Sequence, residues 1–514
     1  MQALPVSRFA ARAGVVAFAV ASSLVAIGAR AENPANEILA ASNPDERAQA
    51  DRPASPEKRP DAKTDGPGKD DPATEPPEES QIPSDAQDGT VSDANPFGLP
   101  PAEKKKPASP AVHGFVQFEA ARAYHDPAHW SKLLTRAEAG TQGRFSSELK
   151  WKISGRVDYD AVYSLDDYYP AEVARDQRFN ASLRETYLDV EAGDWDFRVG
   201  RQHVVWGEMV GLFVADVVSA KDMREFLLPE FEVLRIPQWA ARAEYFNGAL
   251  HAEVLWIPIA GYDETGKPGA EFFTLQPVPP GFAAQYRNEV RPRRNFANTN
   301  YGARLSLLHS GWDASAFVYR SMDATPTFYR QIVTSATSPQ PTFVFEARHD
   351  PIKQIGGTLA KDVSSSVVFK AETVFTKGRQ FSVLRFSDPD GVVPQNTLDS
   401  GLGLDFSLPE ETRLNFQLFQ RAYFAHDPDL IQAKRVNGYS IYLNGKITNR
   451  LEGQVLWLSA LNRTDWLLRP RLSWSFEKNW RWMVGADIFG GSPTGLFGRF
   501  DSKDRVYSEV RHSF

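Results

Sequence analysis

Apolar and polar residues alternate one by one along much of the chain from His113 onward. Residues 149–153 alternate apolar side chains with lysines, and residues 157–163, 195–199 and 250–256 repeat the pattern with other charged residues. A period of two is that of a β-strand with one apolar and one polar face. Because the pattern recurs over about four hundred residues, it predicts membrane strands with one face toward lipid and one toward a polar lumen.

The connections between these segments alternate in length. Short turn signals occur at 154–155, 193–194, 247–248, 310–311, 409–410, 448–449 and 478–479, and long polar connections at 205–237, 259–299, 324–341 and 378–396. Short turns at one rim and long loops at the other are typical of bacterial outer-membrane barrels. We predict an all-β fold for residues 113–514, a transmembrane antiparallel barrel of about eighteen strands. Sixteen strands would fit if the segment 346–361 pairs differently.

The chain ends on one more alternating segment, residues 505–514, which closes with the aromatic residue Phe514. An even number of strands returns this end to the periplasmic rim. A C-terminal strand that ends in Phe resembles the signal by which outer-membrane barrels are recognised for insertion. The expected partners are therefore the barrel-assembly machinery, through Phe514, and the lipid and lipopolysaccharide of the outer membrane.

The first 31 residues predict a secretory signal peptide. Arg8 and Arg12 give a basic start, residues 13–28 form an apolar run that is short for a membrane span, and an Ala-Arg-Ala sequence at 29–31 fits a cleavage site. An uncleaved anchor is the alternative. The chain has no Cys, which excludes disulfides, thiolate metal sites and a lipoprotein acyl anchor.

Residues 32–112 predict a disordered periplasmic tail rather than a domain. They contain fifteen of the 36 prolines, a single aromatic residue, Phe97, and a net charge of −8, too little apolar surface to offset the entropy of ordering. The tail would be either a tether to a periplasmic partner or a solvated spacer. Residues 113–514 carry only about −2 of the formal charge of −7. No overall field therefore selects anions or cations, and nothing supports nucleic-acid binding.

The segment least like a barrel strand is residues 206–237. It does not alternate, and it combines apolar side chains that need burial with charged ones that need partners. Both needs would be met if the segment folded into the barrel, as a constriction or as a structural brace. Its expected wall partners include Arg198, Arg201, Glu208 and Arg242. The predicted lumen residues are Arg198, Arg201, His203, Trp206, Glu208, Asp216, Asp222, Arg224, Glu225, Glu230, Arg235, Trp239 and Arg242.

Residues 183–246 read LRETYLDVEAGDWDFRVGRQHVVWGEMVGLFVADVVSAKDMREFLLPEFEVLRIPQWAARAEYF. This stretch resembles an uncharacterised, porin-like family of proteobacterial outer-membrane proteins, catalogued as a domain of unknown function. The resemblance implies an outer-membrane location and assigns no activity. Family members tend to have Asn-Pro ahead of the acidic residue that corresponds to Asp222, whereas residues 219–221 here read Ser-Ala-Lys.

Other candidate chemistry in the sequence is sparse. The basic cluster Arg287, Arg291, Arg293 and Arg294 would contact anionic solutes or lipopolysaccharide phosphate, or simply be solvated. The chain has no Gly-x-Ser-x-Gly or His-Glu-x-x-His motif, so we expect no catalytic residue, metal or cofactor. His203, which could meet Glu208 in space, is either the base of a barrel-embedded hydrolase or a hydrogen-bonded wall residue.

These observations lead to one main functional hypothesis. We expect an outer-membrane pore or transport protein, not an enzyme, with residues 206–237 constricting the lumen. The alternative is passage or export of a hydrophobic or amphipathic molecule, with a periplasmic partner reached through residues 32–112.

Overall fold

The computed structural model describes residues 111–207, 209, 214–334 and 340–514. The predicted signal peptide and all but the last two residues of the predicted tail lie outside the described residues. The chain divides into two units, Met1–Pro100 and Pro101–Phe514, and every described residue belongs to the second. Within the described ranges no helix has the length and apolar character needed to cross a membrane.

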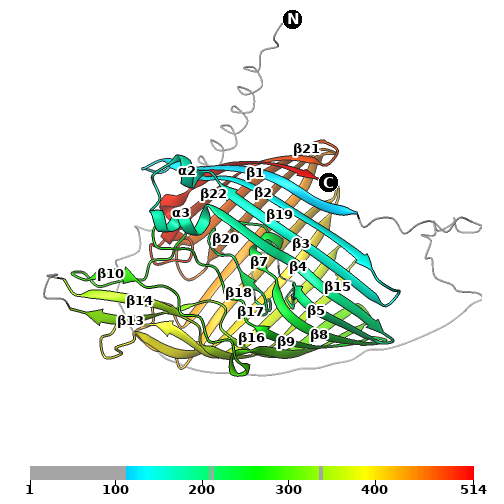
Figure 1. Ribbon diagram of the computed structural model, residues 1–514, viewed down its shortest axis with the longest axis horizontal. Helices are drawn as coiled ribbons and strands as arrows, with labels where there is room; N and C mark the ends of the chain where they lie inside the picture. Colours follow the sequence, from blue (N-terminus) through cyan, green and yellow to red (C-terminus); the bar gives the residue numbers. More distant parts are fainter. Residues whose placement is uncertain (1–110, 208, 210–213, 335–339) are drawn as a thin grey trace, which may run out of the picture. The chain divides into compact units, whose positions relative to one another are not determined.

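Eighteen strands form one antiparallel β-barrel (Figure 1). The first, β1 (Val112–Ala123), pairs with the last, β23 (Arg505–Ser513), which closes the sheet. This confirms eighteen strands and excludes sixteen. The strands between them, in barrel order, are β2 (His129–Arg144), β3 (Leu149–Asp160), β4 (Phe179–Ala192), β5 (Trp195–Gln202), β8 (Gln238–Asn247), β9 (Leu250–Ile259), β11 (Asn300–His309), β12 (Trp312–Met322), β15 (Pro351–Ser364), β16 (Val367–Ser382), β17 (Val392–Leu408), β18 (Thr412–Phe424), β19 (Arg435–Thr448), β20 (Leu451–Ala460), β21 (Asp465–Glu477) and β22 (Trp480–Gly491).

The barrel wall carries apolar side chains on its outer face and polar ones on its inner face. In β9, Val254 and Trp256 are 59% and 40% exposed on the outside, while the alternate residue Glu253 is buried inside. Exposed apolar side chains of this kind recur on strands around the whole barrel. Such an outer surface suits contact with lipid, because water would disfavour so much exposed apolar area.

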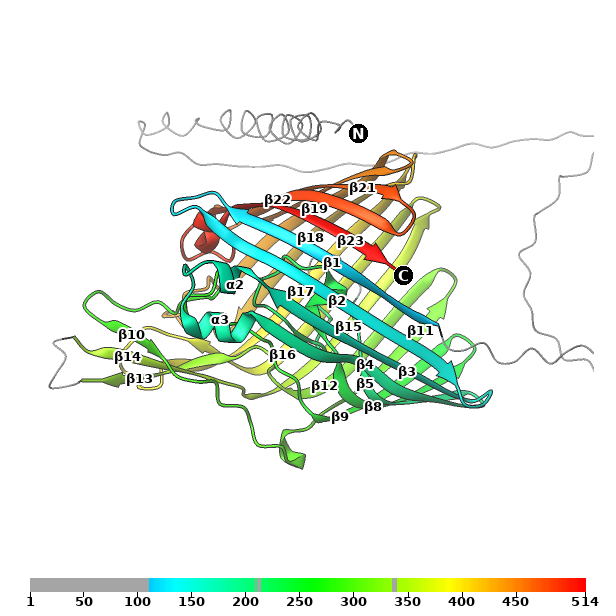
Figure 2. The same cartoon turned by 45° about the horizontal axis from the view of Figure 1, so that its top comes forward.

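The two rims of the barrel differ in their connections. Eight connections of two to four residues lie at the rim that also holds Phe514, referred to here as the turn rim. The opposite rim, the loop rim, carries the helices α2 (Val162–Leu165) and α3 (Ala171–Gln177) and the 3-10 helix η2 (Gly498–Lys503). Figures 1 and 2 show the C-terminus and the helices at opposite ends of the barrel. This asymmetry agrees with the predicted short turns and long loops.

Two predicted boundaries are wrong. The Ser154-Gly155 pair is not a turn, because β3 runs through it with an irregular pairing opposite β4. Glycine within a strand marks a bulge as readily as a turn. The predicted connection 378–396 is mostly strand, since β16 ends at Ser382 and β17 begins at Val392. The loop between them is only 383–391.

The long connections contain further short elements. β13 (Thr327–Val333) and β14 (Thr342–Arg348) form an antiparallel pair that β10 (Ala283–Tyr286) joins in parallel, and this sheet extends beyond the loop rim (Figures 1 and 2). The 3-10 helix η1 (Phe296–Asn298) precedes β11. The connection from β5 to β8 holds β6 (Ala220–Lys221), α4 (Phe231–Leu234) and β7 (Arg235–Ile236).

Candidate functional site

Residues 203–237, named here the lumen insertion, leave the wall at the end of β5 and return to it at β8. The short strands β6 and β7 pair with each other, Ala220 with Ile236 and Lys221 with Arg235. This pairing brings together the two ends of residues 222–234, which we call the tip. The insertion is therefore a folded element with its own hydrogen bonds, which satisfies backbone groups that the barrel ladder does not reach.

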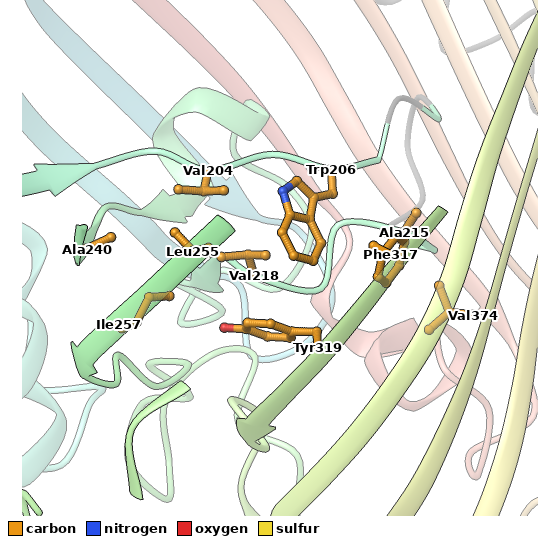
Figure 3. Close-up of a cluster of buried hydrophobic side chains, with 10 residues drawn as sticks. All are labelled: Val204, Trp206, Ala215, Val218, Ala240, Leu255, Ile257, Phe317, Tyr319 and Val374. Carbon is orange, nitrogen blue, oxygen red and sulfur yellow. The ribbon is translucent and has the colours of Figure 1, made fainter. Parts of the chain in front are cut away.

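The first part of the insertion packs against an apolar patch of the inner wall. Trp206 is fully buried, and the rings of Phe317 and Tyr319 lie 5.1 and 5.5 Å from its own. Its indole N–H donates to the Glu253 carboxylate at 3.2 Å. The cluster, named here the apolar anchor, joins the insertion to β8, β9, β12 and β16 (Figure 3) and consists of Val204, Trp206, Ala215, Val218, Ala240, Leu255, Ile257, Phe317, Tyr319 and Val374.

The wall is shaped to receive this part of the insertion. The two carboxylate oxygens of Glu372 on β16 accept the backbone N–H groups of Met209 and Ala215, at 2.9 and 2.8 Å. A side chain at Gly401 of β17 would collide with the sulfur of Met209. The absent Cβ therefore leaves room for Met209 against the wall, and Glu372 satisfies two amides that would otherwise be buried without a partner.

The tip meets the opposite side of the wall through charge. The carboxylate of Glu225 lies 2.6 Å from Nζ of Lys132 on β2 and 3.4 Å from Arg505 on β23. Glu230 lies 3.4 Å from Arg471 on β21. Burial raises the pKa of Glu225, but Lys132 and Arg505 outweigh it and hold this pKa below its ordinary value. Glu225 is therefore ionised near neutral pH.

Guanidinium groups of the wall also hold the backbone of the insertion. Arg469 of β21 donates to the Leu228 carbonyl at 2.7 Å, and Arg156 of β3 donates to the Val233 carbonyl at 3.2 Å. On β4, Arg184 donates to two further insertion carbonyls at 2.9 Å each. Because β3 and β4 lie on one flank of the tip and β21 on the other, these bonds reach the insertion from both sides.

Aromatic packing adds to these polar contacts of the tip. The ring of Phe226 lies 6.3 Å from that of Phe489 on β22 and 5.1 Å from that of Phe500 in η2. Phe226 and Leu228 belong to a buried cluster that also includes residues of β20 and β21. In barrel order these strands face the β8–β16 side that holds the apolar anchor. The insertion thus crosses the lumen.

A second segment, residues 261–273 of the β9–β11 connection, lies against the tip. The Met223 N–H donates to the Glu264 carbonyl at 2.8 Å. Further along, the carboxylate of Glu271 lies 2.9 Å from Nε2 of His129 at the start of β2. Burial raises the pKa of Glu271, but the hydrogen bond from His129 and the nearby lysine and tyrosine hold it below its ordinary value. The lumen is therefore crossed by two contacting segments.

Two cavities adjoin the tip. One extends along β1, β2 and β21–β23 toward the turn rim, as far as Gln117 and Arg511, and the other reaches Tyr163 and Gln177 in the helices of the loop rim. The same six residues line both cavities, namely Lys132, Arg136, Glu225, Pro229, Val233 and Arg505. The tip and its charged contacts therefore lie between a cavity that extends toward the turn rim and a cavity that extends toward the loop rim.

Most of the predicted lumen residues of the insertion lie inside the barrel, although their partners differ from those expected. Arg198 pairs with Asp189 at 2.9 Å and Arg242 with Glu244 at 2.6 Å, both within the wall rather than with the insertion. Glu208 lies outside the described residues. Trp206, Glu225 and Glu230 contact the wall as described, whereas Asp216 pairs with Arg235 at 2.9 Å and Asp222 with Arg224 at 2.6 Å within the insertion.

Two predicted lumen residues lie on the outer face of the barrel. Trp239 is 41% exposed, and its neighbour Ala240 points inward to the apolar anchor. Arg201 is the cross-strand partner of Trp239, and cross-strand partners share a face. The position of both residues next to the insertion suggested a lumen role, but strand alternation turns their side chains outward.

His203 lies just beyond β5 in a basic environment. Burial lowers its pKa to about 4, and Arg184 acts in the same direction. A base of that strength is largely ineffective near neutral pH, so this lowered pKa does not favour His203 as the base of a hydrolase. In the described part of the chain no three His, Asp or Glu side chains are grouped to hold a metal ion.

The predicted basic cluster lies in the β9–β11 connection, with Arg287, Arg291, Arg293 and Arg294 all exposed. Arg291 lies 2.9 Å from Glu289 and 3.2 Å from Glu264. The backbone N–H of Arg287 donates to the Phe345 carbonyl of β14. Acidic neighbours thus neutralise part of this cluster, and its backbone helps to attach the loop-rim sheet.

Sequence reasoning missed the wall residues that hold the insertion. Lys132, Glu253, Glu372, Arg469 and Arg505 stand on strands scattered over most of the chain. The sequence feature that could have pointed to these residues is that each occupies a polar position in an alternating strand. That feature assigns a side chain to the lumen, but it does not tell which strands face the tip once the barrel closes.

The fold and the site define a closed, porin-like barrel whose lumen is crossed by an internal segment. The model of the family described as "Protein of unknown function (DUF1302)" matches residues 132–388, half of the chain. The chain belongs to this family, as the resemblance predicted, and the matched range contains the whole lumen insertion. No curated protein matches the chain.

Solved structures with a similar barrel come from several bacteria. OccAB3 of Acinetobacter baumannii is 10% identical, with 79% of this chain and 99% of that chain covered and a TM-score of 0.46. OmpF of Salmonella typhi in complex with daunomycin is 10% identical, with 79% and 97% covered and a TM-score of 0.38. An anion-selective porin from Comamonas acidovorans is 11% identical, with 79% and 99% covered and a TM-score of 0.37. These likenesses concern the fold alone.

Proposed function

We propose that this protein is an outer-membrane pore or transport protein whose lumen insertion constricts the passage. One observation carries the proposal: the insertion crosses the barrel from the apolar anchor to the β21–β23 side, and cavities remain on both sides of its tip. The apolar outer face, the closed sheet and the short turns at one rim support a place in the outer membrane.

The two ends of the insertion favour a constriction over a brace. A brace would be packed against the wall along its whole length, as Trp206 is at the apolar anchor. At the tip, Phe226 and Leu228 pack in a buried cluster, but the side chain of Glu230 is 43% exposed. The remaining wall contacts of the tip are ion pairs and hydrogen bonds to carbonyl groups. A polar solute that brings equivalent charges can replace these ion pairs and hydrogen bonds, because it restores the partners that the buried wall groups would otherwise lose. The tip is therefore the part that can move aside.

The proposal is tested by single-channel recording in planar bilayers. We expect the purified full-length protein to conduct, and a variant with a short Gly-Ser linker in place of residues 222–233 to conduct severalfold more. The control is Arg385→Ala, which removes a 2.6 Å ion pair to Asp427 between two outer loops and should leave conductance unchanged. The absence of conductance in both the wild type and the shortened variant would overturn the proposal.

A further inference from the structure

The wall that faces the tip carries a cluster of ion pairs, named here the wall network. Its positive members come from β2, β21, β22 and β23, and all of them except Arg481 line one or both of the two cavities. They are Lys132, Arg136, Arg469, Arg471, Arg481 and Arg505.

The wall supplies fewer negative charges than positive ones to this network. Lys132 pairs with Glu119 at 3.1 Å and Arg136 with Asp158 at 2.7 Å. A single carboxylate, Asp487, is shared by Arg469 at 2.7 Å and Arg505 at 2.9 Å, and Arg481 lies 3.6 Å from Glu509. Among these pairs, four wall acids accompany six wall cations, which leaves the wall network with two excess positive charges.

The tip provides the two missing negative charges. Glu225 bridges Lys132 and Arg505, and Glu230 bridges Arg471 and Arg481 at 3.4 and 3.8 Å. Each tip carboxylate therefore lies between two wall cations that come from different strands. A displacement of the tip would leave these cations facing the lumen without enough counter-charge, which is costly in a poorly hydrated site.

We propose that this wall is a path for small organic anions that carry carboxylate groups, and that Glu225 and Glu230 are built-in substitutes for them. A solute carboxylate would take the place of a tip carboxylate between two wall cations while the tip moves aside. Guanidinium and ammonium groups suit this exchange, because they bind any carboxylate in the same geometry. A cationic solute would meet a wall that already has excess positive charge. The inference rests on the proposed pore function.

The shared lining of the two cavities makes the path continuous. Lys132, Arg136 and Arg505 line both the cavity toward the turn rim and the cavity toward the loop rim. With the tip displaced, an anion would pass from one cavity to the other while remaining in contact with the same cations. The anion would therefore not have to leave one set of cations before it reaches the next.

The test is the reversal potential of single channels in a KCl gradient. We expect Glu225→Gln combined with Glu230→Gln to raise the permeability of chloride relative to potassium severalfold over the wild type, because the wall then keeps its excess charge. Glu232→Gln is the matched control. It removes one negative charge from the same tip, but its side chain is exposed, and its selectivity should stay close to that of the wild type.

A second measurement uses the unaltered protein. Succinate added to one side should reduce the chloride current of the wild type in a concentration-dependent way, and 1,4-diaminobutane, a dication of similar length, should not. If the double variant fails to fold, each single variant should shift selectivity in the same direction by a smaller amount.

The outcomes separate this inference from the proposed function. Channels that conduct but show unchanged or potassium-favouring selectivity in the Gln variants, or no effect of succinate, would overturn the anion path and leave the pore in place. A lack of conductance in the wild type and in the variant shortened at residues 222–233 would overturn the pore itself.

Discussion

The two ends of the lumen insertion meet the barrel wall with different balances of apolar and charged contacts. At the apolar anchor, Trp206 is fully buried among aliphatic and aromatic side chains of β8–β16. At the tip, Glu225 and Glu230 form ion pairs with cations of β2 and β21–β23, beside the buried side chains of Phe226 and Leu228. Apolar packing is lost outright when a group leaves it, whereas much of the attraction in a buried ion pair is offset by desolvation. The insertion therefore carries ion pairs with the wall at its tip that a charged solute can replace, and it lacks such pairs at the apolar anchor.

The largest expected effect comes from removing the centre of the apolar anchor. Trp206→Ala should cost about 3–5 kcal/mol, the usual range for truncating a buried large aromatic side chain, and should release the first half of the insertion. Faster hydrogen–deuterium exchange of residues 214–220 in detergent would show this. Trp239→Ala is the control, because it removes the same ring from the outer face. Equal hydrogen–deuterium exchange of residues 214–220 in the Trp206→Ala and Trp239→Ala variants would show that Trp206 does not hold the insertion.

A smaller loss is expected when the anchor keeps its shape but loses one hydrogen bond. In Glu372→Gln only one side-chain oxygen remains for the amides of Met209 and Ala215, and the new NH₂ group faces an N–H donor. Leaving a buried amide unsatisfied costs about 1–3 kcal/mol. Exchange of the Ala215 amide should accelerate, while Glu452→Gln near the turn rim should leave it unchanged. Similar protection in both variants would show that Glu372 does not hold the insertion.

The smallest effect is expected at the tip and depends on pH. Lys132 and Arg505 hold the pKa of Glu225 below its ordinary value, so its ionised form stabilises the docked tip. This stabilisation is complete above the ordinary Glu value of about 4.3 and is lost as the pH falls through the lower pKa of the docked state. Channel conductance should therefore rise as the pH is lowered below about 4.

Glu225→Gln serves as the control for this titration. It removes the group, so its channels should already be more open at neutral pH and should lack this part of the pH response. An identical pH profile in the wild type and the variant would assign the response to other acids.

Much of the barrel could be predicted from the sequence, because a membrane strand repeats every two residues and lipid constrains one of its faces. The number of strands and the short turns at Gly193 and Gly311 were read from that pattern. The Ser154-Gly155 pair was misread, since the same residues fit a turn and a bulge. Trp239 was misplaced, because proximity to the insertion along the chain says nothing about which face a strand residue occupies.

The candidate site was predictable only in part for a related reason. The need of residues 206–237 for burial and for partners is a local property of the chain, and it placed the insertion in the lumen. The partners are not local: Glu225 pairs with Lys132, 93 residues away, and with Arg505, 280 residues away.

The sequence by itself determined the two-faced strands, their approximate number and the existence of a segment that could not stay in the wall. Closure of the sheet decided between sixteen and eighteen strands. Only the tertiary structure decided how that segment is held. Closure of β1 on β23 brings the first strands beside the last ones and gathers their inward-facing cations on one side of the lumen. Strand periodicity sets the face of each residue, but the angular position of a strand around a barrel exists only after the sheet has closed.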